Sequence, residues 1–105
     1  MSVNVKHYVM IGVDIGYRND DELYERLEPY MELGKEVFCL FDGMNGEYII
    51  LGEIVQVGDQ YEGMKYKDIS LIELKVMADR VEHNLRKLFG IEHCRPELFT
   101  VSHWY

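Results

Sequence analysis

The clearest element in this chain is an amphipathic helix in its second half. Apolar residues recur there at spacings of 3, 4, 3, 4 and 3, which places them on one face of an α-helix. Ser70 and Glu73 form a capping box before this stripe, and Gly90 stands where such a helix would end. The sequence therefore predicts a long helix between Ser70 and Gly90. Its apolar stripe consists of Leu71, Leu74, Ala78, Val81, Leu85 and Leu88.

Four other segments have the patterns of β-strands. In the first, the odd positions are mostly Val and Ile, whereas the even positions are mixed in character. This period of two predicts a strand with its odd side chains inward. The second and third flank a glycine-containing loop at 42–46 that suits a hairpin. Gly52 inside the third strand indicates a bulge or a close approach of two backbones. The predicted strands are 5–13, 36–41, 47–57 and 97–104.

A shorter helix is predicted between the first two strands. Asn19 or Asp20 can cap its start, and Gly34 is placed to end it. Pro29 cannot donate to the preceding turn, so it should kink this helix or split it in two. The apolar stripe of this helix consists of Leu23, Leu27, Tyr30 and Met31.

The elements follow the order strand, helix, strand, strand, helix, strand. This order resembles the split βαβ arrangement (βαββαβ) of ferredoxin-like folds. Right-handed crossovers would place both helices on one face of a four-stranded antiparallel sheet. We therefore expect a single α+β domain over residues 1–105, a length sufficient for one hydrophobic core.

Charge is distributed very unevenly along the chain. Of its 19 acidic residues, 13 lie between positions 14 and 62, where only three basic residues occur, and the net charge is −8. Proteins that bind nucleic acids or anionic membranes use clustered Lys and Arg, and this chain has no such cluster. We therefore expect no direct contact with nucleic acid or membrane. A partner recognised through charge would be a basic protein.

Four carboxylates on the shorter predicted helix recur at spacings of 4, 3 and 4, on the side away from its apolar stripe. Like charges at this spacing destabilise a helix by a few tenths of a kcal/mol per pair. This pattern predicts either a docking surface for a basic partner or a solvated face that keeps the protein soluble. The predicted partner-binding residues are Asp21, Glu25, Glu28 and Glu32, with Asp42 and Glu47 as outer members.

The second and third predicted strands are apolar on both faces, whereas the helices would cover only one. If Phe99 and Val101 pack toward the helices, the open face carries Tyr8, Met10 and Trp104. An apolar patch of this kind exceeds what monomers expose, so we expect it to form a homodimer interface or to line a small-molecule pocket. Alternatively, the loop at 58–68 folds over the sheet and hides it.

No arrangement of residues indicates catalysis. His93 and Cys94 are adjacent, which is a poor spacing for a metal site or a nucleophile with its base. His7 and His103 share inward parity on neighbouring predicted strands. They are either core histidines satisfied by hydrogen bonds or two ligands of a metal site completed by Cys39 or a carboxylate. We expect no catalytic residues, no metal and no cofactor.

The cysteine content and the first residues indicate a compartment. Two cysteines are too few for a disulfide framework, and the N-terminal segment has no signal-peptide pattern. We therefore expect a cytoplasmic protein. The favoured function is that of a small, acidic, non-enzymatic interaction protein with a regulatory, accessory or inhibitory role, of the kind that mobile elements encode. The alternative is a small-molecule-binding or enzymatic domain with a pocket at the open sheet face or at a dimer interface.

Overall fold

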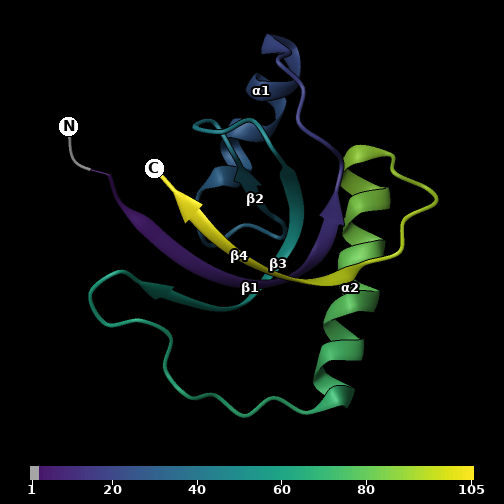
Figure 1. Ribbon diagram of the computed structural model, residues 1–105. Coiled ribbons are helices and arrows are strands. Elements are labelled where there is room, and N and C mark those ends of the chain that lie inside the picture. Colours follow the sequence, from purple (N-terminus) through teal and green to yellow (C-terminus); the bar gives the residue numbers. More distant parts are fainter. Residues whose placement is uncertain (1–2) are drawn as a thin grey trace.

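The computed structural model describes residues 3–105 and contains the predicted elements in the predicted order, with one short 3-10 helix added (Figure 1). Residues 3–105 form an α+β fold with a four-stranded antiparallel sheet and two α-helices. Within residues 3–105, no helix combines the length and the apolar character needed to cross a membrane. The elements are β1 (Val5–Asp14), α1 (Asp21–Leu27), η1 (Glu28–Met31), β2 (Phe38–Phe41), β3 (Ile49–Asp59), α2 (Leu71–Phe89) and β4 (Glu97–Trp104).

The strands lie in the order β2-β3-β1-β4. Every neighbouring pair is antiparallel, so β3 and β1 form the centre of the sheet and β2 and β4 its edges. The predicted range of β4 agrees with the structure, whereas β2 begins two residues later than predicted and β3 is shifted by two residues.

The helix ends follow the local chemistry of the sequence. The Ser70 hydroxyl accepts a hydrogen bond from the backbone N–H of Glu73 (3.1 Å), and Gly90 ends α2 in the left-handed conformation (φ 68°). Leu71 lies outside the core, so the packed stripe of α2 begins at Leu74. The prediction that Leu71 belongs to this stripe is therefore wrong.

The shorter helix is split, as Pro29 predicts. Asp20 caps α1 by accepting from the backbone N–H groups of Glu22 and Leu23, and α1 ends at Leu27. Pro29 then lies in the first turn of η1. Backbone N–H groups in a first turn have no acceptor within the helix, so the N–H that proline lacks is not needed there. Helical structure stops at Met31, ahead of Gly34, which was expected to end it.

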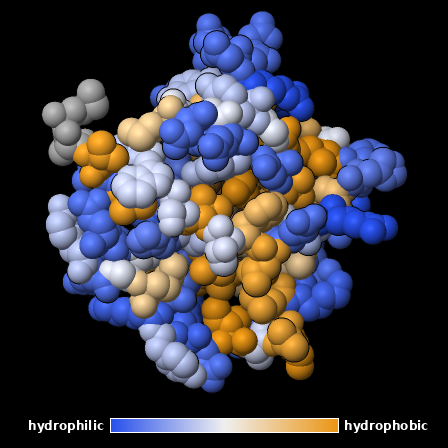
Figure 2. Space-filling model, in the orientation of Figure 1, coloured by the Kyte–Doolittle hydropathy of each residue, from blue (hydrophilic) through white to orange (hydrophobic). Residues whose placement is uncertain are grey.

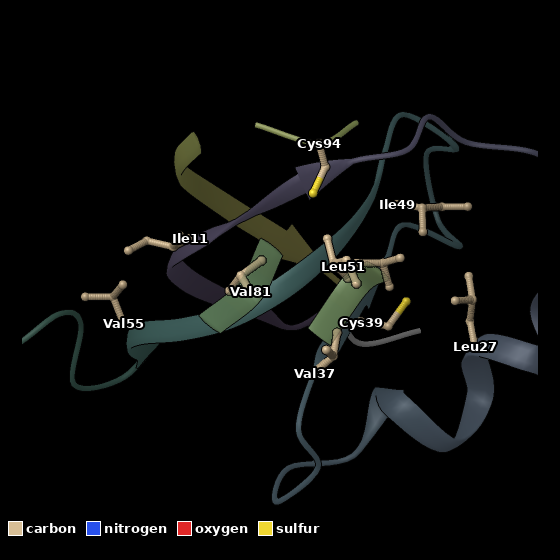
Figure 3. Close-up of a cluster of buried hydrophobic side chains, with 10 residues drawn as sticks. Ile11, Leu27, Val37, Cys39, Ile49, Leu51, Val55, Val81 and Cys94 are labelled. Atoms are coloured by element: carbon tan, nitrogen blue, oxygen red, sulfur yellow. The ribbon is translucent and has the colours of Figure 1, made fainter. Parts of the chain in front are cut away.

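The main core lies between the sheet and both helices (Figure 3). Ile11 of β1 and Leu51 of β3 meet Leu27 from α1 and Val81 from α2 in one cluster of buried side chains. The odd-numbered side chains of β1 therefore face the helices, as their alternation predicts.

A second cluster lies on the opposite face of the sheet. Tyr8 and Met10 of β1 belong to it, together with Leu40 and Ile50. Within the single chain, Met10 is 0% exposed and Tyr8 only 8%. The prediction of an open apolar patch that needs a second copy to cover it is therefore wrong. The loop at 58–68 is not the cover either, because its Tyr61 and Tyr66 are strongly exposed.

The sheet is strongly curved (Figure 1), and we call this second face, which carries Tyr8, Met10, Leu40 and Ile50, the curled face. Gly12 and Gly52 are directly paired in β1 and β3, and a Cβ atom on Gly52 would stand only 2.6 Å from the Cα of Gly12. A register shift between Val9 and Met10 adds a bulge to the same strand pair. Glycines and bulges are the devices that allow a sheet to bend sharply. Gly52 thus has the close backbone approach that the sequence indicated.

Candidate functional site

The acidic segment from 14 to 62 divides into two groups of residues. The first group is used inside the fold. Asp14, Asp20, Asp42 and Asp59 each accept hydrogen bonds from backbone N–H groups in turns or at a helix start. Glu53 forms a pair of hydrogen bonds with Arg80 (both 2.6 Å), and Glu62 forms an ion pair with Lys65 (3.6 Å).

The second group has no such partner among residues 3–105. Its seven side chains are exposed, and none takes part in an ion pair or a side-chain hydrogen bond within residues 3–105. We call this group the acidic lobe. It comprises Asp21, Glu22, Glu25, Glu28, Glu32, Glu36 and Glu47. Strongly hydrophilic side chains gather at the upper end of Figure 2, where Figure 1 places α1.

Aromatic packing fixes α1 against the hairpin that carries Glu47. The ring of Phe41, at the end of β2, contacts the rings of Tyr17 (5.5 Å between centroids) and Tyr24 (5.2 Å). Gly46 in the hairpin lies against the ring of Tyr17. The carboxylates of α1 and Glu47 are therefore held at the same end of the molecule.

Two of the predicted partner-binding residues are placed differently from expectation. Asp42 is only 1% exposed, and its carboxylate accepts from the N–H groups of Asn45 (3.0 Å) and Glu47 (2.9 Å). It stabilises the hairpin and cannot be an outer member of a docking surface. Glu32 lies beyond η1 in extended conformation, so only Asp21, Glu25 and Glu28 occupy helical positions.

Trp104 does not share a face with Tyr8 and Met10. Trp104 pairs with Val5, and Tyr8 pairs with Val101. Directly opposed residues of antiparallel strands point to the same face, and positions 5 and 8 point to opposite faces. The predicted grouping is therefore wrong. Phe99 and Val101, which were expected to face the helices, pack with Tyr8 and Met10 instead.

The curled face holds a hydrogen-bonded pair that the sequence did not indicate. The hydroxyl of Tyr48 lies 2.7 Å from Nδ1 of His103, although 55 positions separate the two residues. Burial raises the pKa of Tyr48 to about 12, with the nearby carboxylates of Asp42 and Glu47 adding to the effect. Burial also lowers the pKa of His103 below its ordinary value. Both groups are therefore neutral at pH 7.

A hollow of about 250 Å³ opens on this face beside the pair. Its lining includes Tyr8, Phe38, His103 and Tyr105, with Lys6 as its cation. Tyr8 and Phe38 are stacked (5.8 Å between centroids). The hollow therefore offers aromatic surface and a neutral polar pair, which is a suitable environment for a small, flat and mainly apolar ligand.

The remaining histidine and cysteine residues do not converge. His7 contacts Ser102 (Nδ1 to Oγ, 2.9 Å) on the face opposite His103, so the expectation that these histidines lie close is wrong. Cys39 and Cys94 are buried and unpaired, and burial raises the pKa of the Cys39 thiol to about 12. No group of three or more His, Cys, Asp and Glu side chains in the described part of the chain could hold a metal ion.

Comparison of the chain with protein-family models, with curated proteins and with solved structures finds no match.

Proposed function

We propose that this protein is a non-enzymatic interaction protein that binds a basic site on a partner protein through its acidic lobe. One observation carries the proposal. Six of the 13 acidic residues between 14 and 62 have partners inside the fold, whereas the seven of the acidic lobe have none among residues 3–105. Charges without internal partners are available to another molecule.

The clustered charge of the acidic lobe destabilises the free protein and favours binding to a basic surface. Neighbouring like charges repel one another, and a surface rich in Lys or Arg would relieve that repulsion on binding. Complementary charge mainly accelerates encounter and selects the partner. Because the carboxylates are exposed, their attraction is screened beyond about 8 Å at physiological ionic strength. Binding through the lobe is therefore expected to weaken strongly as salt is added.

Two variants of equal charge test this proposal. In the lobe variant, Asp21 becomes Asn and Glu25, Glu28 and Glu32 become Gln. The control variant makes the same four-charge change at exposed residues elsewhere, namely Asp68, Glu73, Glu92 and Glu97. Proteins captured by each variant from cell extract are quantified at low and high ionic strength.

The lobe variant is expected to lose basic proteins that the wild type and the control variant both capture at low salt. If all three forms capture the same proteins in the same amounts, the lobe is solvated surface and the proposal fails. An equal loss in both variants would show that net charge, and not the lobe, governs capture.

The hollow beside Tyr48 and His103 supports a second candidate, a small-molecule-binding domain. A ligand present at 100 times its Kd would stabilise the fold by about 2.7 kcal/mol. For a chain of this size that corresponds to a rise in Tm of about 10 °C or more. A compound that raises the Tm of the wild type, but not of Phe38→Leu, would identify this site. A metabolite screen without any such compound would count against it.

The order of elements and the strand order β2-β3-β1-β4 support a ferredoxin-like fold as part of this proposal. That architecture hosts many unrelated functions, so it carries no argument about activity. The buried, unpaired cysteines support a reducing compartment such as the cytoplasm.

A further inference from the structure

The outer edge of β4 is long and unprotected. The strand spans eight residues at the edge of the sheet, and its only formally charged residue is Glu97 at its start. Proteins usually guard such an edge with lysines, prolines or bulges, or cover it with another segment. β4 has none of the first three within its length, and in the part of the chain that the structure describes it pairs only with β1.

The hydrogen bonds at the end of β4 identify the groups that face outward. Asn4 and Tyr105 exchange both of their backbone hydrogen bonds (2.8 and 2.9 Å). Hydrogen-bonded pairs alternate along an antiparallel ladder, so the other odd residues of β4 also bond toward β1. The outward N–H and C=O groups therefore belong to the even residues. These are Leu98, Thr100, Ser102 and Trp104.

The outward N–H and C=O groups of β4 can form hydrogen bonds with the same groups of a second copy. In an antiparallel pairing centred on Val101, Leu98 lies opposite Trp104 of a second copy, and Thr100 lies opposite Ser102. The N–H and the C=O of all four outward residues then form hydrogen bonds with the second copy. A pairing centred on Thr100 would place Pro96 opposite Trp104, and proline has no N–H to donate.

The side chains agree with this register. Leu98 is 57% exposed and Trp104 45% exposed, and both lie on the helix side of the sheet. Pairing about Val101 would bring each Leu98 against the Trp104 of the other copy, so that the largest exposed apolar side chains of β4 cover one another.

Charge favours this edge over the opposite one. The acidic lobe lies around α1, η1 and the hairpin, and η1 packs against β2. β2 also has only four residues. Two chains that each carry a charge of −8 can therefore approach through β4 with their most acidic regions at the far edges.

From these observations we propose that β4 pairs with β4 of a second copy about a two-fold axis at Val101, which joins two sheets into one continuous antiparallel sheet. This interface replaces the curled face that the sequence suggested for dimerisation. It is independent of any partner that the acidic lobe binds.

Light scattering across a concentration series tests the proposal. The wild type is expected to reach about twice the chain mass of 12.4 kDa at tens of micromolar. Ser102→Pro removes an outward N–H without touching a bond to β1, and should shift the midpoint of association to at least tenfold higher concentration. Ser102→Ala loses the same hydroxyl contact with His7 but keeps the N–H, and should associate like the wild type.

Cysteine cross-linking tests the register even if Ser102→Pro fails to fold. Val101 would lie opposite itself, at a non-hydrogen-bonded position where Cα atoms stand about 4.5 Å apart. Val101→Cys should therefore form a disulfide-linked dimer under mild oxidation. Thr100→Cys should not, because its counterpart would lie diagonally across the pair, about 7–8 Å away. A monomeric wild type at every concentration, or cross-linking of Thr100→Cys in place of Val101→Cys, would overturn the proposal.

Discussion

Replacing Gly52 by alanine should destabilise the protein severely, because two backbones meet at this position. The added methyl group would stand 2.6 Å from the Cα of Gly12 and closer still to the carbonyl oxygen of Ile11. Overpacking costs about 1–3 kcal/mol where side chains can shift. Here the backbone of β1 must move, so we expect a loss of about 3 kcal/mol or more. Domains are stable by only about 5–15 kcal/mol in total.

Urea unfolding followed by circular dichroism measures this change. A loss of about 3 kcal/mol corresponds to a fall in Tm of about 12 °C or more for a chain of this size. Gly43→Ala is the matched control, because the nearest atom to its added Cβ, on the ring of Phe41, is 4.0 Å away and its φ is not positive. The control should be stabilised by about 0.4–1 kcal/mol through reduced freedom of the unfolded chain. A cost below about 1 kcal/mol for Gly52→Ala would refute the close approach of β1 and β3.

Three further predictions concern buried groups. Asp42→Ala should cost about 1–3 kcal/mol in urea titration, because it leaves two backbone N–H groups of the hairpin without their acceptor, whereas Glu47→Ala should change stability by no more than about 0.5 kcal/mol. His103 has an ordinary pKa of 6.5 that the fold lowers, so below pH 6.5 the unfolded chain binds a proton that the folded chain does not. The free energy of unfolding should therefore stay constant above pH 6.5 and fall as the pH drops toward the lowered pKa. The change of this free energy with pH should be smaller in His103→Gln. An equal change in the variant would contradict the assignment of this pH dependence to His103. The Cys39 thiol, whose pKa burial raises to about 12, should react with a thiol reagent at pH 8 only as fast as the protein opens, so rapid labelling of the native state would show that it is accessible.

The sequence predicts most of the secondary structure because local chemistry decides it. Ser70 and Gly90 bound α2, Asp20 starts α1, and Pro29 divides α1 from η1. The alternation of residues along β1 is also a local feature. It therefore correctly predicts that the odd positions of β1 face the helices.

Other features depend on contacts between distant segments. β4 has apolar residues at both parities, so only its register with β1 reveals that Phe99 faces Tyr8 and Trp104 does not. An aspartate in a hairpin has the same sequence signal whether it is buried, as Asp42 is, or exposed. The close approach of the backbones of β1 and β3 depends on the pairing of Gly12 with Gly52, which links residues 40 positions apart.

The place of β1 in the sheet has a consequence for the order of folding. β1 is synthesised first, yet it lies between β3 and β4, and β4 is the last strand of this chain to be made. Gly12 pairs with Glu97 and Val5 with Trp104, so these contacts join residues 85 to 99 positions apart. Long-range pairing of this kind slows folding, and unpaired strand edges invite aggregation while it is incomplete. During translation, one edge of β1 therefore stays without a partner strand until β4 has been synthesised.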